Sequence, residues 1–393
     1  MPFARVGSTR GGHAIAVANA VPLGVGFMKL LVQPDDGVTP LVKGINSAKR
    51  TIDILIFRFD RSEIEAALLN ALGRGVRVRA LIASTNRGGE RHLRALEMRL
   101  LAAGITVART ADDLVRYHGK MIVIDGHELY LLAFNFTYLD TDHSRSFGVV
   151  TRDRELVQEA MRLFEADMQR QPYTCGTGAF VVSPLNARKE LSAFLRAAKK
   201  ELLIYDPCIS DTAMLRLLQD RIKDGLSVRV IGRASRLGAR KLIQVHLHAR
   251  AIVRDGADVF IGSQSLRGAE LDTRREIGVV FSDVKIAGQL VKLFNQDWEL
   301  AQPAAVAGDG IEESVPAAEI AKKVAKAVTN GLPPMVPVLE AAVNEVAGNG
   351  VDIPLNSDKL QDTVKDAVKH AVKEAVRDVV EKVATLQEPG KGT

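Results

Sequence analysis

The stretch YHGKMIVIDGHELYLLAFNFT, residues 117–137, places His118, Lys120 and Asp125 in the pattern H-x-K-x-x-x-x-D, with Asn135 following. Alternating apolar residues on both sides of Asp125 predict two short strands joined by an Asp-Gly turn. Because side chains alternate faces along a strand, His118 and Lys120 should point the same way. An ammonium and an amide can hold the anionic oxygens of a phosphate diester, while an imidazole attacks or protonates.

A second copy of this pattern, LHARAIVRDGADVFIGSQSL, occupies residues 247–266. Its polar residues fall in the same register and are His248, Arg250, Asp255, Ser263 and Ser265. His248 lies 130 positions after His118, and Asp255 lies 130 positions after Asp125. Two copies at one spacing argue against coincidence.

The duplication extends beyond the motif. AKRTIDILIF at 48–57 matches AKKELLIYDP at 198–207, an offset of 150, whereas FGVVT at 147 matches IGVVF at 277, an offset of 130. The first copy contains a predicted extra helix, residues 91–103, where the second copy is 20 residues shorter. Repetition at this scale indicates two similar domains. Packed about a pseudo-twofold axis, they would bring both motifs to one cleft, a common place for a site.

Hydrophobic periodicity predicts alternating strands and helices in each copy. In the first copy, strands are expected at 28–32, 51–59, 76–82 and 147–151, and helices at 38–48, 61–74, 91–103 and 153–169. Such alternation is typical of a mainly parallel sheet with helices on its faces. The predicted organisation is an irregular leader at 1–27, domains at 28–172 and 178–302, a linker at 303–316, and an Ala/Val/Lys-rich helical tail at 317–393.

Composition is that of a soluble globular protein, with 47% hydrophobic and 25% charged residues. Residues 311–393 carry 10 Lys and Arg against 13 Asp and Glu, net −3, and the remaining 43 against 34 give the body +9. Only Cys175 and Cys208 are cysteines, and the apolar run at 14–32 is interrupted by Pro22 and Lys29. These features predict a cytoplasmic protein, with peripheral membrane contact as the alternative.

The tail is predicted to contain two helical stretches, the longer one running from about 357 to 386. Its apolar face consists of Ala and Val and lacks large side chains. Such a face could dock on the body of the protein, self-associate or contact a membrane surface, and these are the three hypotheses for the tail.

The paired motif resembles that of the phospholipase D superfamily, H-x-K-x4-D-x6-G-S-x-N, which is usually present twice in one chain. The resemblance covers residues 28–300. It implies an α/β fold of two similar α-β-α sandwich domains about a pseudo-twofold axis, plus the helical tail. It also implies hydrolysis or transfer of phosphodiesters without a metal or cofactor, through a covalent phosphohistidine.

By the same resemblance, His118 is the nucleophile and His248 the general acid and base, with Lys120 and Glu276 also catalytic. The substrate phosphate would be bound by Lys120, Asn135, Arg250, Ser263 and Ser265. Glu276 follows His248 by 28 positions, and the counterpart after His118 is Ser146. This spacing predicts that Glu276 supports the ring of His248, so the two histidine roles could be reversed.

Each copy departs from the family pattern. Leu132 and Ala133 stand where Gly-Ser is usual, which is expected to remove a hydroxyl and add bulk at the phosphate pocket. Arg250 replaces lysine, keeping the charge with a different geometry. Ser265 replaces asparagine and has a shorter reach.

Other polar residues have structural interpretations. Asp125 and Asp255 begin Asp-Gly turns, and a structural role in the turn is predicted for both. His127, His143 and His246 have no histidine at the equivalent position of the other copy and are predicted to lie at the surface or on the rim of the site.

Three functions follow from these residues. The first is a phospholipase D-type phosphodiesterase acting on phospholipid headgroups. The second is a nuclease of the same superfamily, which the basic body permits, although no ladder of aromatic residues for base stacking is present. The third is a catalytically weakened phosphate-binding or assembly protein whose tail self-associates.

Overall fold

Two apolar segments occupy the centres of two sheets, β2 (Thr51–Ile56) and β10 (Glu201–Ile209). Five of the six residues of β2 are buried, as expected for a strand covered on both faces. The structure is a computed structural model that describes residues 27–84 and 90–304, which belong to one compact unit. The predicted tail, and nearly all of the predicted leader and linker, lie outside the described residues.

The first sheet has the strand order β1-β8-β7-β6-β2-β3-β4. The flanking strands are β1 (Met28–Gln33), β8 (Ser144–Thr151), β7 (Glu128–Leu132), β6 (Met121–Ile124), β3 (Arg77–Ile82) and β4 (Thr106–Arg109). The two strands predicted on either side of the Asp-Gly turn are β6 and β7, so this prediction is confirmed.

The second sheet has the order β18-β12-β11-β10-β14-β15-β17-β9. Its further strands are β18 (Gln302–Pro303), β12 (Arg240–Lys241), β11 (Ser227–Ala234), β14 (Ala251–Arg254), β15 (Asp258–Gly262), β17 (Ile277–Ser282) and β9 (Phe180–Val182). The sheet thus reaches one residue into the predicted linker. Three two-residue strands connect the halves and are β5 (Arg116–Tyr117), β13 (His246–Leu247) and β16 (Arg274–Arg275).

The prediction of mainly parallel sheets is wrong. Pairing is parallel between β2, β3 and β4 and between β10, β11 and β12, whereas the other neighbours along both sheet orders are antiparallel. The reason is the motif itself, since a tight turn can join only antiparallel neighbours.

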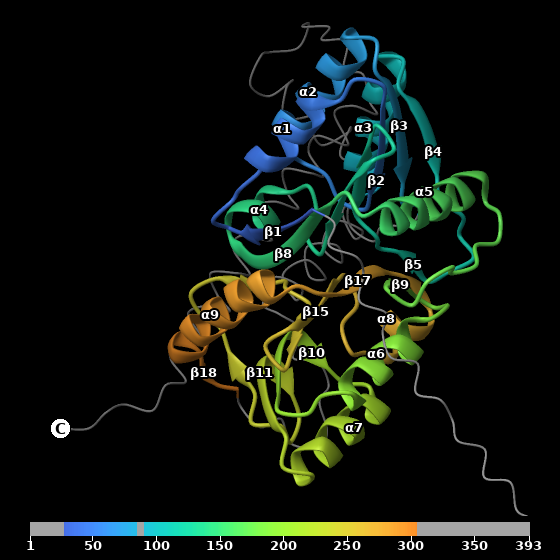
Figure 1. Ribbon diagram of the computed structural model, residues 1–393. Coiled ribbons are helices and arrows are strands. Elements are labelled where there is room, and N and C mark those ends of the chain that lie inside the picture. The colour runs from blue at the N-terminus through green and yellow to red at the C-terminus, as the bar shows by residue number, and fades with distance from the viewer. Residues whose placement is uncertain (1–26, 85–89, 305–393) are drawn as a thin grey trace, which may run out of the picture. The chain divides into compact units, whose positions relative to one another are not determined.

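The helices cover both faces of each sheet (Figure 1). Those of the first half are α1 (Thr39–Ser47), α2 (Ser62–Gly73), α3 (Glu90–Ala102), α4 (Tyr138–Asp142) and α5 (Arg154–Gln169). Those of the second half are α6 (Ala187–Arg196), α7 (Thr212–Lys223), α8 (Gly268–Asp272) and α9 (Val284–Leu300). The extra helix expected in the first half is α3. Asp153, Asp211 and Asp283 cap α5, α7 and α9 by accepting backbone N–H bonds.

One hydrophobic core is shared by the two halves. Residues of α1, α2 and α3 pack on the outer face of the first sheet, and those of α6 and α7 on that of the second. Between the sheets, α5, α9 and the inner faces form a single cluster. Within it, the ring of Tyr205 lies 5.1 Å from that of Phe147 and 5.0 Å from that of Phe294. The shared core fixes one half against the other and so positions the two motifs.

Candidate active site

The backbone before each motif histidine pairs with a strand of the opposite half. β5 runs parallel to β16, and β13 runs parallel to the start of β8. The backbone N–H of His118 donates to the carbonyl of Arg275 at 2.7 Å, and that of His248 donates to the carbonyl of Arg145 at 3.0 Å. Each histidine is therefore positioned by the half to which it does not belong.

The same two arginines form largely buried ion pairs across the halves. Arg145 contacts Asp297 at 2.9 Å, and Arg275 contacts Asp167 at 3.1 Å. The arginines are 130 positions apart, and so are the aspartates. Charges buried with well-aligned partners are costly to separate. These pairs hold the two backbone registers that place the histidines.

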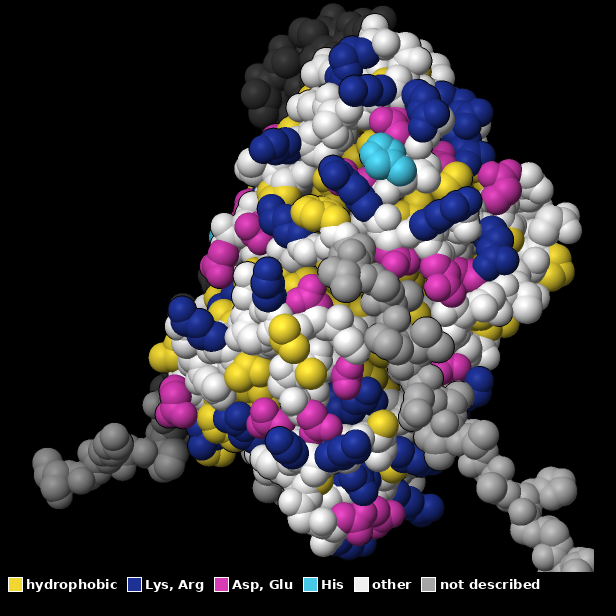
Figure 2. All heavy atoms as spheres, in the orientation of Figure 1, with side chains coloured by type: hydrophobic (Ala, Val, Ile, Leu, Met, Phe, Trp, Pro, Cys, Tyr) yellow, Lys and Arg dark blue, Asp and Glu magenta, His cyan; other side chains and the backbone are white. Residues whose placement is uncertain are grey.

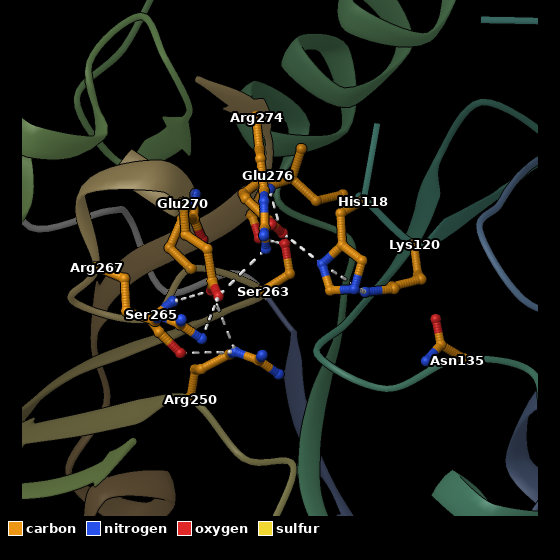
Figure 3. A network of polar contacts seen from close by, with 12 residues as sticks. His118, Lys120, Asn135, Arg250, Ser263, Ser265, Arg267, Glu270, Arg274 and Glu276 are labelled. Atoms are coloured by element: carbon orange, nitrogen blue, oxygen red, sulfur yellow. Dashed lines mark hydrogen bonds and ion pairs between the residues drawn. The ribbon is translucent and has the colours of Figure 1, made fainter. Parts of the chain in front are cut away.

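His118 lies in a buried network of polar groups (Figure 3). Its Nδ1 is 2.7 Å from Oε2 of Glu276, which comes from the second half. The Nζ atom of Lys120 lies 3.0 Å from both ring nitrogens. The ring of Phe57 packs edge-on against the imidazole, with centroids 4.4 Å apart. The ring is thus held on several sides.

Burial controls the protonation of this network. Burial lowers the pKa of His118 well below its ordinary value, and the positive charge of Lys120 lowers it further. Burial also lowers the pKa of Lys120 to about 7, against the opposing effect of Glu276. The pKa of Glu276 is raised, again by burial. His118 is therefore a neutral imidazole near pH 7, which is the nucleophilic form.

His248 has a different acidic partner. Its Nδ1 lies 3.3 Å from Oδ2 of Asp140, an ion-pair distance without the alignment of a hydrogen bond. The same carboxylate oxygen accepts the backbone N–H and the side-chain amide of Asn135, at 2.7 and 2.6 Å. Burial lowers the pKa of His248 to about 4, and Asp140 only partly offsets this. Burial would raise the pKa of Asp140, yet its contacts with His248 and Asn135 hold it well below its usual range.

Arg250 is the cation of the second half. Its Nε donates to Oγ of Ser265 at 3.2 Å, and its Nη1 donates to the carbonyl of His248 at 3.1 Å. Oε2 of the buried Glu270 lies 3.7 Å from Arg250 Nε, and Oε1 lies 3.4 Å from Arg274. The guanidinium is therefore tied to fixed acceptors, whereas the Lys120 ammonium lies against the imidazole of His118.

The expectation that Leu132 adds bulk to the phosphate pocket is wrong. Its side chain is fully buried in the core of the first half. Gly148 makes room for it, because a Cβ at that glycine would lie 2.8 Å from a methyl of Leu132. Ala133 is buried where the second half has Ser263, whose hydroxyl bonds the backbone of Ile277. The hydroxyl that Ala133 lacks therefore corresponds to one that, in Ser263, bonds to the backbone.

The two motif aspartates lie in the turns. The carboxylate of Asp125 accepts backbone N–H bonds from residues 49–51, and that of Asp255 from residues 199–201. Both have a φ of 53°, which aspartate tolerates better than most residues. Each carboxylate ties its hairpin to the start of the central strand, β2 or β10.

The expectation that Glu276 supports His248 is wrong. Its carboxylate contacts His118, because β16, just before Glu276, pairs with β5, just before His118. At the equivalent position, the Ser146 hydroxyl donates to the backbone carbonyl of His248 at 3.4 Å. Spacing along the chain cannot reveal a pairing that crosses between the halves.

Asp140, Glu270 and Phe57 were not among the residues predicted from the sequence. The two acids lie 130 positions apart, and each follows the motif Asn135 or Ser265 by five residues. Each accepts the backbone N–H of that residue at 2.7 Å. An acid conserved in register between the copies was therefore the available signal for both.

Within residues 27–84 and 90–304, no group of three or more His, Cys, Asp or Glu side chains is placed to hold a metal ion. Over the same residues, none of the helices is both long and apolar enough to span a membrane.

Comparisons with known proteins agree with this architecture. A family described as "Cardiolipin synthase, PLD-like domain" matches residues 41–168 and 191–298, more than half of the chain. The chain therefore belongs to the phospholipase D superfamily. The match covers parts of both halves and includes both motif histidines.

Individual relatives are more distant. The chain is 29% identical to the mitochondrial cardiolipin hydrolase of Danio rerio over 130 residues, 32% of this chain and 56% of that protein. It thus spans about half the length of this curated relative.

Two solved structures share the fold. Polyphosphate kinase from Porphyromonas gingivalis superimposes with a TM-score of 0.59 and 17% identity, over 69% of this chain and 47% of that one. Phosphatidylserine synthase from Haemophilus influenzae superimposes with a TM-score of 0.57 and 11% identity, over 88% of this chain and 96% of that one. At these identities the likeness concerns the fold alone.

Proposed function

We propose that the protein is a metal-independent phospholipase D-type enzyme that hydrolyses or transfers phospholipid headgroup phosphodiesters through a phosphohistidine. The observation that carries this proposal is the crossed pairing of each motif histidine with an acid of the opposite half. His118 meets Glu276 at 2.7 Å, and His248 meets Asp140 at 3.3 Å. Lys120, Arg250 and His248 each lower the pKa of His118, which supports a single site shared by both halves.

In the first step, Nε2 of His118 attacks phosphorus. With the ring proton on Nδ1, directed at Glu276, the lone pair of Nε2 is available. The phosphorus–oxygen bond to the alcohol breaks, and His248 gives its proton to the leaving oxygen. Because the pKa of His248 is about 4 in the free protein, the negative charge of the bound diester has to raise it.

In the second step, His248 accepts a proton from water or from an acceptor alcohol, whose oxygen attacks phosphorus. The phosphorus–nitrogen bond then breaks and frees His118. Lys120 and Arg250 stabilise negative charge on the phosphoryl oxygens in both steps. Asn135 is held against Asp140 by its amide nitrogen, so its role is to orient this acid.

The charge distribution favours a lipid substrate over a nucleic-acid substrate. On the face shown in Figure 2, Lys and Arg side chains are interspersed with acidic ones and do not form a continuous stripe. A nonspecific nucleic-acid site usually combines a basic groove with stacking aromatic residues. The names of the matching family and of the curated relative both refer to cardiolipin, a phospholipid, and support the same choice.

The test is a substrate screen in EDTA. Phosphatidylcholine, phosphatidylglycerol and cardiolipin in mixed micelles would be compared with bis(p-nitrophenyl) phosphate and single-stranded DNA. We expect lipid turnover by the wild type, loss of turnover in His118→Ala, and retention in the surface variant Lys223→Gln. Cleavage of DNA without lipid turnover would select the nuclease, and no turnover of any diester would overturn the enzyme proposal.

A further inference from the structure

A crevice of about 600 Å³ opens beside His248. One wall is the segment 241–247, which leads directly into this histidine. The opposite walls come from Pro207 and Arg233, near the ends of β10 and β11, and from His143 at the end of α4. Because the chain is duplicated, an equivalent crevice would be expected beside His118.

The equivalent position beside His118 is filled. Its counterparts of Pro207 and Arg233, found by the 150-residue offset, are Phe57 and Ala83. These two residues and Tyr117 form a small buried cluster. The ring of Phe57 is the one that packs edge-on against His118.

A third substitution also favours an open crevice in the second half. Leu247 stands where the first half has Tyr117, a member of the buried cluster. The position beside His118 is thus closed by aromatic rings, whereas the crevice beside His248 is open and its lining includes the charged side chains of Arg233 and Lys241. The alcohol that leaves the site, or the acceptor that enters it, has room to pass through this crevice and not through the filled position beside His118.

The crevice has a positive lining. Arg233 and Lys241 are exposed in it, as are the imidazoles of His143 and His246. Of the described lining residues, Asp142 is acidic, and its carboxylate is paired with Arg61 at 2.6 Å. This lining is complementary to an anionic ligand.

His246 connects the crevice to the site. Its ring stacks on that of His248, with centroids 6.2 Å apart and planes inclined by 28°. Its Nδ1 lies 3.1 Å from the hydroxyl of Ser144, which fixes the ring. A ligand in the crevice would therefore lie beside the histidine assigned to proton transfer.

We propose that this crevice binds the alcohol part of the diester and selects an alcohol that carries its own anionic group, such as a second phosphate ester. The proposal rests on the proposed function and extends it. The alcohol leaves from, and the acceptor enters at, the side of His248, which exchanges a proton with that oxygen. The closed side of His118 leaves this ring to the covalent bond with phosphorus.

Binding of the free alcohol tests the proposal without requiring turnover. Calorimetry would compare sn-glycerol 3-phosphate with glycerol on the wild type and on Arg233→Gln/Lys241→Gln. A matched control, Lys189→Gln/Lys223→Gln, removes two positive charges from exposed positions outside the crevice lining. We expect the crevice variant to bind glycerol 3-phosphate about 10- to 100-fold more weakly, the value for a charged hydrogen bond. The control should match the wild type.

Two further measurements separate the possible failures. Lys120→Met should bind glycerol 3-phosphate as the wild type does, and a large loss there would mean that the probe occupies the phosphodiester position instead. In turnover, the crevice variant should raise KM for short-chain phosphatidylglycerol phosphate more than for phosphatidylglycerol. Wild-type binding that is absent, or equal in the crevice variant, overturns the crevice even if lipids are cleaved. Binding that follows the expected pattern without any turnover would uphold the crevice and overturn the enzyme proposal.

Discussion

The two half-sites descend from one repeated sequence, yet they differ in their acids, cations and surroundings. His118 lies 2.7 Å from Glu276 with a buried lysine over its ring, whereas His248 lies 3.3 Å from Asp140 beside an open crevice. In the first half-site the ring is enclosed by Phe57. Two halves with the same backbone can thus perform two different chemical tasks, because side chains at equivalent positions differ while the fold stays the same.

The cations differ in the same sense. Arg250 has permanent charge and several fixed acceptors, whereas burial brings the pKa of Lys120 to about 7. A lysine in this state can lose its charge near neutral pH. The cation of the first half-site is therefore sensitive to pH near neutrality, whereas that of the second is not.

The largest expected effect comes from exchanging the histidines one at a time. His118→Ala and His248→Ala should each lower lipid turnover by at least about 10⁴-fold, as in other sites whose residues act as a unit. With a p-nitrophenyl leaving group, which needs no proton, His248→Ala should recover the burst of the first step and His118→Ala should not. Stopped-flow release of p-nitrophenolate measures this, and equal recovery in both variants would contradict the assigned roles.

The next effect concerns Glu276, whose counterpart in the first half is Ser146 and not an acid. Glu276→Gln should lower kcat by about 10²–10³-fold, in the range of general acid–base contributions, because the imidazolium-like transition state loses its partner. Its counterpart Ser146→Ala removes a hydroxyl that donates to a backbone carbonyl at 3.4 Å and should change kcat by less than about threefold. Similar losses in both variants would show that the crossed pairing has no catalytic role.

The pH dependence separates the two cations. As pH rises through about 7, Lys120 loses its proton, so kcat/KM of the wild type should fall about tenfold per unit above that pH. Lys120→Arg keeps the charge and should flatten this alkaline limb, whatever its activity at pH 6. An unchanged alkaline limb in Lys120→Arg would assign the titration to another group.

The smallest effect is on stability and compares the two turns. Asp125 is buried and its backbone donors are partly buried, whereas Asp255 is half-buried with more exposed donors. Asp125→Ala should lower the free energy of unfolding by about 2–3 kcal/mol and Asp255→Ala by about 1–2 kcal/mol, with activity per folded molecule retained. Chemical denaturation measures both values.

The turn prediction also has a pH signature. Burial opposes ionisation of Asp125, but three backbone N–H groups hold its pKa below the ordinary value. Its stabilisation is therefore present above the unfolded pKa, about 4, and is lost as pH falls through the folded value. The difference between wild type and Asp125→Ala should shrink in acid, and a constant difference would contradict the charged-acceptor role.

Features that depend on neighbours along the chain were predictable from sequence. The hairpin around Asp125, the extra helix and the 130-residue register all follow from periodicity, turn residues and repetition. The parallel sheet was mispredicted because alternation of elements does not define strand order, and the bulk at Leu132 was mispredicted because the room left by Gly148 is a tertiary feature.

The amino-acid sequence by itself determined that two copies of one motif exist and which residue types each carries. Only the tertiary structure decided that Glu276 meets His118, that Asp140 meets His248, and that one of two related crevices is filled. The physical reason is that these contacts depend on two-residue strands pairing across the halves and on a core that the halves share. Such pairings join positions more than a hundred residues apart, and spacing along one copy carries no information about them.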